Sequence, residues 1–366
     1  MIDNKKIEEL IKKHGIKSKP EAMSEALKYI KDRMEGRIKS LKTPWLGLNK
    51  AGIGGLEWGS MMTIGARPGA GKTMFVSQIL REVKDHNMDQ KFNILEFQFE
   101  MGTKQAGSRD LAGEVAMDYG LIVSADKPLD PHTYARLEKI VEMYNHQYNQ
   151  DCRKLSAQGC QRISVSNPCT VEEMKDIILS FYDAWGSNPI IVTIDHSWLI
   201  KKDRSEKDKF DVLYNVTEML MQLKNQIPII VLMLTQLNRS IEEATRKNPG
   251  SISNYPTSSD IFGGDALMQG SDMVIVLSRP FKLDILSYGP YAYNTDEDMV
   301  FVHLIKIRNG NDKVKILFFK IQGKQQRFIE TVEPKADRPE GVGIRLPLSA
   351  RRGLRSAPSA EIGEEL

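Results

Sequence analysis

Short apolar runs alternate with amphipathic helical patterns along most of this sequence. Strands are predicted at 61–65, 92–99, 163–165, 189–194, 228–235 and 273–277, and helices at 73–83, 103–117, 134–148, 171–185 and 210–224. Because several of these strands are apolar on both sides, both faces of the sheet must be covered, as in parallel sheets flanked by helices. The sequence therefore predicts an α/β fold with a mostly parallel sheet.

The last part of the core is predicted to be an antiparallel hairpin. Residues 304–312 (LIKIRNGND) alternate like a strand, and a second strand-like run at 313–320 follows the turn signal Asn309-Gly310. Lys306 and Arg308 are two residues apart, so their side chains are expected on one face of the strand. Either they protect an exposed edge strand from unwanted pairing, or they approach an anion. The pattern leaves both interpretations open.

Composition places few limits on function. Hydrophobic residues make up 41% of the chain and charged residues 27%, with a net charge of +3, as in ordinary soluble proteins. This charge permits nucleic-acid binding without arguing for it. The sequence has no apolar run of about 18–20 residues, the length that spans a bilayer, and no signal peptide, so we expect a cytoplasmic protein. Three cysteines without a CxxC pair favour free thiols over disulfides or a zinc site.

Two segments flank the predicted core. Residues 1–42 are expected to be helical, with one apolar stripe made by Met23, Leu27, Ile30, Met34 and Ile38. A lone helix cannot bury such a stripe, so it docks either on its own domain or on a neighbouring subunit. Residues 45–58 are glycine-rich and predicted to be turns, and residues 334–366 are predicted to be a disordered tail.

The strongest motif is a P-loop between a predicted strand and a predicted helix. It consists of Ala66, Arg67, Pro68, Gly69, Ala70, Gly71, Lys72 and Thr73. The backbone amides of such a loop surround phosphate oxygens at the N-terminus of the following helix. Lys72 is expected to reach the β- and γ-phosphates, and Thr73 to bind Mg²⁺. The motif therefore predicts a nucleotide-binding site.

Three polar residues end predicted strands at the carboxyl edge of the sheet, where such folds bind ligands. Asp195 ends a buried strand, the Walker B pattern, and is expected to hold Mg²⁺ with Thr73. Glu100 is a candidate general base, and Gln236 is a candidate sensor of the γ-phosphate. On position alone, Glu100 fits an exposed strand end equally well, and Gln236 fits an ordinary loop entry better.

Together these motifs resemble the replicative helicases of the DnaB type. GARPGAGKT, FEM, IIVTID, TQLNR, a segment from Ser259-Asp260 to Asp272, and KIRNG occur in that family's order and spacing over residues 40–330. The family consists of hexameric RecA-fold motors, often encoded by bacteriophages. The resemblance implies a RecA-like ATPase and helicase domain at 43–333 that uses ATP and Mg²⁺. It also implies a homohexamer that moves 5′ to 3′ on single-stranded DNA in a bacterial cell.

The resemblance implies roles for individual residues as well. It supports Glu100 as the base and Gln236 as the sensor, and it identifies residues 21–38 as a linker helix that docks on the adjacent protomer. In a ring, Lys306 and Arg308 are expected to reach the γ-phosphate bound by the next subunit, with Arg308 as the arginine finger.

Two departures from the family pattern bear on partners and DNA contacts. Residues 1–20, which precede the linker, are too few for the family's primase-binding domain, so a primase or loader partner is left open. Phe262-Gly263-Gly264-Asp265 stands where the family has Arg-Glu-Ser-Gly, although the amides of Gly263 and Gly264 can still approach phosphate. Further candidate DNA contacts, which also fit a solvated surface, are Arg239, Arg246 and Lys247 in loop 238–258, and Lys201, Lys202 and Arg204.

A second function fits the same motifs. The P-loop, Asp195 and Gln236 also serve a RecA-like DNA-binding ATPase of the recombination or switch type that does not unwind duplexes. The linker stripe and the hairpin cations favour the helicase, whereas Gly263-Gly264-Asp265 and the short N-terminal segment favour the alternative.

Overall fold

The computed structural model describes residues 7, 11, 17–147 and 161–334, and the chain divides into two compact units, Met1–Leu41 and Lys42–Leu366. In the first unit, helix α2 (Lys19–Met34) begins with a capping box. The Ser18 hydroxyl accepts from the Glu21 amide, and the Glu21 carboxylate accepts from the Ser18 amide. These bonds satisfy two amides that a helix N-terminus otherwise leaves unpaired.

The apolar stripe of α2 is exposed within this chain. Met23, Leu27, Ile30 and Met34 are between 60% and 79% exposed, and α2 buries none of its residues. Ile38, the fifth predicted member, follows the end of the helix. The predicted tail at 334–366 lies outside the described residues except for Pro334.

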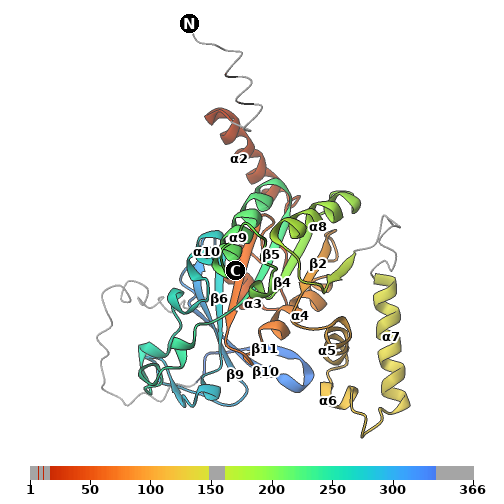
Figure 1. The fold of residues 1–366 in the computed structure, drawn as a ribbon, viewed down its shortest axis with the longest axis vertical. Helices are drawn as coiled ribbons and strands as arrows, with labels where there is room; N and C mark the ends of the chain where they lie inside the picture. Colours follow the sequence, from red (N-terminus) through yellow and green to blue (C-terminus); the bar gives the residue numbers. More distant parts are fainter. Residues whose placement is uncertain (1–6, 8–10, 12–16, 148–160, 335–366) are drawn as a thin grey trace, which may run out of the picture. The chain divides into compact units, whose positions relative to one another are not determined.

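The second unit is built on one nine-stranded sheet (Figure 1). In spatial order its strands are β11 (Arg327–Thr331), β10 (Ile316–Gln322), β9 (Met299–Ile307), β6 (Met273–Ser278), β1 (Ser60–Ala66), β5 (Ile229–Gln236), β4 (Ile190–Asp195), β2 (Asn93–Gln98) and β3 (Arg162–Val165). The run from β6 to β3 is parallel, whereas β9, β10 and β11 pair antiparallel. Strands β7 (Ser287–Tyr288) and β8 (Tyr293–Asn294) form a separate ribbon. The predicted α/β fold with an antiparallel end is confirmed.

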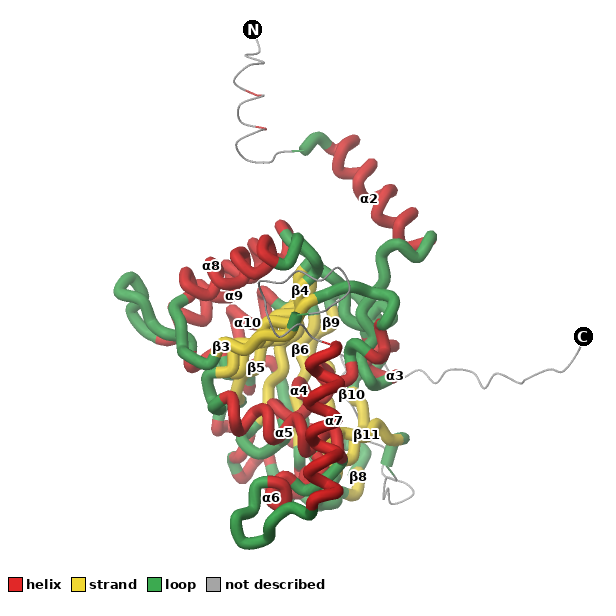
Figure 2. Tube along the Cα trace, turned by 90° about the vertical axis from the view of Figure 1, so that its right-hand side faces the viewer, coloured by secondary structure: helices red, strands yellow, loops and turns green. Residues whose placement is uncertain are grey.

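Helices cover both faces of this sheet (Figure 2). They are α3 (Leu46–Ala51), α4 (Lys72–Glu82), α5 (Thr103–Val115), α6 (Tyr119–Ile122), α7 (Pro131–Gln147), α8 (Val171–Ala184), α9 (Lys209–Gln226) and α10 (Gly264–Gly270). On one face, Ile178 of α8 and Leu220 of α9 share an apolar core with Val192 and Ile194 of β4. Helices α4 and α5 lie on the opposite face. Side chains that alternate along each strand therefore contribute to two separate cores.

Three parts of the fold differ from the sequence-based expectation. Residues 46–51, predicted as turns, form α3, because Trp45, Leu48 and Ala51 repeat at helical spacing and are all buried. The turn at Asn309-Gly310 is part of a longer connection, since β9 ends at Ile307 and β10 begins at Ile316. Strand β11 was not among the predicted elements, and it extends the hairpin to three antiparallel strands.

Candidate nucleotide-binding site

The P-loop leaves the carboxyl end of β1, in the middle of the sheet, and leads into α4. Gly69 and Gly71 have φ values of +76° and +94°, which favour glycine. A Cβ on Gly71 would lie 2.8 Å from the ring of Phe328 and 2.9 Å from Ile321. Strands β10 and β11 therefore pack directly against the loop, and the predicted strand–loop–helix context is present.

Thr73 and Asp195 are in direct contact at the start of α4. The Thr73 hydroxyl donates to Asp195 Oδ2 at 2.7 Å, and the Lys72 ammonium donates to the Thr235 carbonyl at 3.3 Å. Asp195 is only 6% exposed. Burial raises its pKa, while Thr73 and Lys72 act in the opposite direction. Burial lowers the pKa of Lys72, against the charges of Asp195 and Glu100. The structure thus brings Lys72, Thr73 and Asp195 together.

Glu100 and Gln236 meet around a histidine that the sequence analysis did not single out. Nε2 of His196 lies 3.9 Å from the Glu100 carboxylate and 3.5 Å from the Gln236 amide nitrogen. Its Nδ1 accepts from the Trp198 amide at 3.3 Å, which assigns the ring proton to Nε2. Burial lowers the pKa of His196, and the charge of Lys72 lowers it further. The one sequence signal for this residue is its place directly after Asp195.

Two further cations beside the P-loop were also missed. Arg279, which follows β6, and Lys282 both donate to the Gly69 carbonyl, at 3.3 and 3.2 Å. Burial lowers the pKa of Arg279. Burial also lowers the pKa of Lys282, and the charge of Arg279 lowers it further. Two like charges against one carbonyl favour an anion at this part of the loop. A basic pair after an apolar strand is too common in sequences to have been recognised.

The hairpin cations lie at the other edge of the sheet. Strand β9 runs antiparallel to β6, with Ile307 opposite Met273, whereas the P-loop follows Ala66, which is opposite Leu277 at the far end of β6. The ammonium of Lys306 donates to the Met268 carbonyl. Arg308 lies 3.0 Å from Asp272 and donates to the Gln269 carbonyl. The two cations therefore point to the same side, as predicted, and away from the P-loop of their own chain.

The glycine pair at 263 and 264 lies at the same edge of the sheet as the P-loop. The Phe262 amide donates to the Gln236 carbonyl at 3.0 Å, which fixes this segment beside the end of β5. Gly263 has φ +69°, and a Cβ there would lie 2.5 Å from Leu213. Close packing against α9 therefore accounts for glycine at 263 whether or not its amide also contacts DNA.

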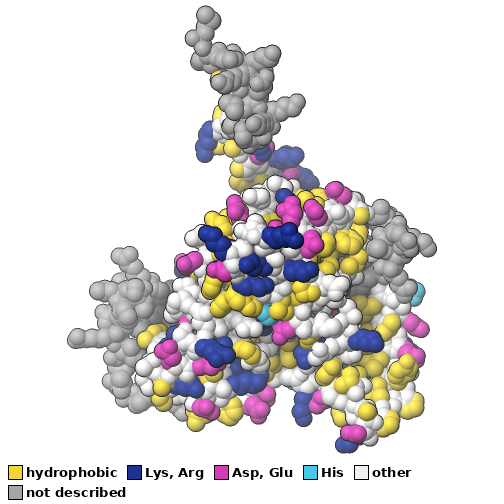
Figure 3. Space-filling model, in the orientation of Figure 1, with side chains coloured by type: hydrophobic (Ala, Val, Ile, Leu, Met, Phe, Trp, Pro, Cys, Tyr) yellow, Lys and Arg dark blue, Asp and Glu magenta, His cyan; other side chains and the backbone are white. Residues whose placement is uncertain are grey.

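The basic candidates for DNA contact differ in how free their charges are. Arg246 pairs with Asp260 at 2.9 Å and donates to the carbonyls of Ser253 and Tyr255, so its guanidinium stabilises the loop itself. Arg239, Lys201, Lys202 and Arg204 are exposed, and Lys247 is half-buried. Figure 3 shows lysine and arginine side chains gathered above a band of hydrophobic side chains on one face of the molecule.

The described residues give no sign of a separate metal centre or a membrane span. Among them, no group of three or more His, Cys, Asp or Glu side chains is arranged to hold a metal ion. Cys169 is a buried free thiol, and the other two cysteines lie outside the described residues. No helix in the described part of the chain is long and apolar enough to cross a bilayer.

Comparisons with known proteins agree with this site. The family model described as DnaB-like helicase C terminal domain matches residues 40–330. The replicative DNA helicase DnaB of Buchnera aphidicola is 23% identical over 66% of this chain and 49% of its own length. The Haemophilus influenzae protein is 21% identical over 83% of this chain and 58% of its own length. The chain thus spans about half the length of these curated relatives.

Solved structures show the same fold. One solved structure, an isolated ATPase domain, superposes with a TM-score of 0.66 at 18% identity, covering 85% of this chain and 99% of that domain. A DnaB-like replicative helicase, described together with its interactions with primase, gives a TM-score of 0.65 at 18% identity, over 88% of this chain and 74% of that chain. Since the family model covers most of the sequence, this chain belongs to the family of DnaB-like helicase C-terminal domains.

Proposed function

We propose that this protein is an ATP-dependent, ring-forming DNA helicase that moves 5′ to 3′ on single-stranded DNA and unwinds duplexes. The observation that carries the proposal is the division of the reactive groups between two edges of one sheet. Lys72, Thr73 and Asp195 meet at the carboxyl edge, whereas Lys306 and Arg308 lie at the opposite edge. The first group serves a nucleotide in its own subunit, and the second is available to a nucleotide in a neighbour.

The residues around the P-loop fit ATP and Mg²⁺. Asp195 Oδ1 is buried and has no hydrogen-bond partner among the described residues, while Oδ2 contacts Thr73. A buried carboxylate oxygen beside a hydroxyl suits a hard cation that takes oxygen ligands. Asp195 and Thr73 would hold Mg²⁺, and the loop amides and Lys72 would hold the phosphates. When bound, the ion neutralises charge that develops on the transferred phosphoryl group. Arg279 and Lys282 add positive charge to the same cradle.

Glu100 is the group best placed to take a proton from the attacking water. Its carboxylate is 51% exposed, so water reaches it, and it lies 3.9 Å from His196. A base of this kind must be within hydrogen-bond reach of the water it activates, either in the resting state or after closure on substrate. Gln236, on the other side of His196, is positioned to report the state of the γ-phosphate to the loop that follows β5.

Residues 1–42 would assemble the ring through α2, ahead of the ATPase domain at 43–333. A groove of about 700 Å³ on the second unit is lined by Phe210, Tyr214 and Ile261, with Asp211 and Asp265 among its polar residues. The rings of Phe210 and Tyr214 are more than half exposed. The apolar stripe of α2 and its flanking lysines complement this apolar groove and its carboxylates. We assign the groove to α2 of a neighbouring subunit.

Single-stranded DNA would contact the loops at the carboxyl edge. The candidates are the amides of Gly263 and Gly264 and the side chains of Arg239, Lys247, Lys201 and Lys202. Phosphate contacts of this kind position a strand without reading its sequence, which suits a motor that must move along any sequence. A primase or loader is a further candidate partner, and we expect the protein to act in the cytoplasm of a bacterial cell, either as a bacterial or as a phage-encoded protein.

A strand-displacement assay tests the function. The full-length protein is incubated with a forked DNA duplex carrying a labelled strand, with and without ATP and Mg²⁺. We expect release of the labelled strand only when both are present. ATP-dependent DNA binding without strand release, on 5′- and 3′-tailed forks alike, would instead identify the non-unwinding ATPase. That alternative is favoured by one observation, the loss of the family's arginine at Phe262-Gly263-Gly264-Asp265.

A further inference from the structure

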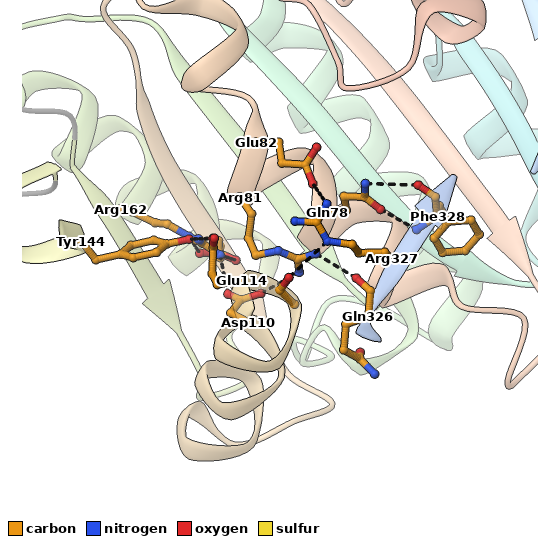
Figure 4. A network of polar contacts seen from close by, with 12 residues as sticks. Gln78, Arg81, Glu82, Asp110, Glu114, Tyr144, Arg162, Gln326, Arg327 and Phe328 are labelled. Atoms are coloured by element: carbon orange, nitrogen blue, oxygen red, sulfur yellow. Dashed lines mark hydrogen bonds and ion pairs between the residues drawn. The ribbon is translucent and has the colours of Figure 1, made fainter. Parts of the chain in front are cut away.

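A buried network of charges lies behind the nucleotide site (Figure 4). Asp110 on α5 accepts from Arg162 at 2.9 Å and lies 3.5 Å from Arg81 of α4. Arg162, on β3, also donates to Glu96 of β2 at 2.7 Å. The side chains of Arg81 and Glu96 are each 2% exposed, and that of Arg162 is 11% exposed. Asp110 is therefore the point where two strands and two helices are joined.

Arg81 extends the network to strand β11. Its Nη2 donates to the Gln326 carbonyl at 2.9 Å. One turn earlier on α4, the Gln78 side chain accepts from the Phe328 amide at 2.7 Å and donates to the Phe328 carbonyl at 3.3 Å. Since Phe328 also packs against Gly71, the loop end and the far end of α4 are both fixed to β11.

Gly113 makes room for the Arg81 guanidinium. A Cβ at this position of α5 would lie between 2.5 and 2.8 Å from three guanidinium atoms. No real Cβ contact is this short, so an alanine here would displace the end of the Arg81 side chain. Glycine inside a helix costs roughly 1 kcal/mol relative to alanine. The helix thus gives up intrinsic stability at the one position where Arg81 must cross it.

Stability alone is a weak explanation for such a network. Removing charged groups from water costs several kcal/mol per ion, and well-packed apolar side chains often serve as well. Burial opposes the charge of Arg162, but Glu96 and Asp110 hold its pKa well above its ordinary value. What the network provides is a fixed geometry, because directional bonds hold four elements in one arrangement.

The elements so fixed are the ones that carry the reactive groups. Lys72 and Thr73 begin α4, and Arg81 lies in its last turn. Glu100 stands between β2, which carries Glu96, and α5, which carries Asp110. Asp110 is seven residues into α5, so roughly 10 Å of rigid helix separates it from the segment of Glu100. We propose that Asp110, held by Arg81 and Arg162, is a positioning residue that sets Glu100 against the P-loop. This inference rests on the proposed role of Glu100 as the base.

The test uses two matched substitutions on one helix. Gly113→Ala displaces the Arg81 guanidinium, whereas Gly107→Ala on the same helix adds a methyl group that has no atom within 4 Å. Both gain helix propensity. We expect Gly107→Ala to keep wild-type kcat for ATP hydrolysis and Gly113→Ala to lose roughly tenfold, because small misplacements of a catalytic group are costly. The dissociation constant of a nonhydrolysable ATP analogue should stay within about twofold in both, since the P-loop is intact.

Asp110→Asn supplies an independent route to the same result. It keeps the shape of the side chain and removes the charge that holds both arginines. All variants are compared at a temperature where circular dichroism shows them folded. If Gly113→Ala and Asp110→Asn keep wild-type kcat when folded, the positioning role is wrong. Weakened binding of the analogue in step with lost hydrolysis would also overturn it, because that result points to general damage of the P-loop.

A double-mutant cycle with Glu100→Gln separates this inference from the proposed function. Single-turnover hydrolysis of labelled ATP is measured for Glu100→Gln alone and combined with Asp110→Asn. If Asp110 acts through Glu100, the second substitution adds little to the first. Full additivity would mean that Asp110 acts elsewhere, and the inference fails while Glu100 stands. Wild-type hydrolysis by Glu100→Gln alone would overturn the proposed base, and the inference with it.

Discussion

The guanidinium of Arg67, in the P-loop, donates to the carboxylate of Glu242 at 2.5 Å and to the carbonyl of Leu237 at 3.0 Å. Glu242 belongs to the loop at 238–258 that follows β5 and supplies several of the candidate DNA contacts. One ion pair, 20% exposed on the arginine side and 38% on the glutamate side, thus joins the nucleotide loop to that DNA loop. A partly exposed pair contributes only about 0–1 kcal/mol, which makes it easy to break and re-form in each cycle.

Removing the charge of Glu242 should weaken the effect of DNA on ATP hydrolysis. We expect Glu242→Gln to keep its rate without DNA within about twofold, because Glu242 contacts the P-loop only through the Arg67 side chain. The stimulation of hydrolysis by single-stranded DNA should fall several-fold. Steady-state ATPase rates with and without an oligonucleotide measure both quantities. Glu243→Gln makes the same chemical change one residue away and should behave like wild type. Undiminished stimulation in Glu242→Gln would show that the pair does not couple the loops.

The order of strands and the place of the nucleotide site were predictable, because both depend on local patterns. Apolar runs identify strands, and a loop such as 66–73 between a strand and a helix has one common use. The placement of Asp195 beside Thr73 followed from the rule that parallel strands end at one edge. Whether Lys306 and Arg308 face their own nucleotide was not predictable, because it depends on the direction of β9 relative to β6.

The network around Asp110 and the cations at Arg279 and Lys282 could not be found from the sequence. Each depends on contacts between residues far apart in the chain, such as Arg81 with Gln326 or Lys282 with Gly69. A charged residue on a helix is ordinarily solvated, so Arg81 and Asp110 gave no signal of burial. His196 was the closest to being recognised, since it directly follows Asp195, but a histidine at a strand end has many uses.

Loss of the Lys72 ammonium should stop catalysis. The group donates to the Thr235 carbonyl and lies where the β- and γ-phosphates are expected, so Lys72→Ala removes charge stabilisation from the transition state. We expect the rate of phosphate release to fall by roughly 10²-fold or more. Lys50→Ala, in the short helix α3, serves as the matched control and should hydrolyse ATP normally. Normal turnover by Lys72→Ala would contradict the assignment of the P-loop.

The stripe on α2 should be required for assembly. Leu27→Glu places a charge in the exposed apolar stripe, and burying that charge in a subunit interface would be costly. We expect the oligomer to shift toward monomer in sedimentation or light scattering, as it should also after deletion of residues 1–40. Phe210→Glu in the groove on α9 should have the same effect from the other side of the contact.

A matched control keeps this result specific to the stripe. Lys28→Glu changes the charge of α2 by a larger amount but lies outside the stripe, so it should leave the oligomer intact. An unchanged oligomer in Leu27→Glu would show that the stripe does not form the interface. Loss of assembly in Lys28→Glu would point to net charge as the cause.

Arg308 should act on the nucleotide of a neighbouring subunit. Its guanidinium lies at the edge of the sheet opposite the P-loop and is 44% exposed, paired only with Asp272 among charged groups of the described residues. An arginine finger supplied by another subunit is worth roughly 10³-fold or more in rate. We expect Arg308→Ala to lose hydrolysis, and mixtures of Arg308→Ala with Lys72→Ala subunits to recover part of it. In such rings, an intact Arg308 from one variant faces an intact P-loop from the other. Lys320→Ala removes a comparable exposed pair with Asp296, at 3.5 Å on β10, and should hydrolyse ATP normally. Full activity of Arg308→Ala by itself would return both hairpin cations to an ordinary surface role.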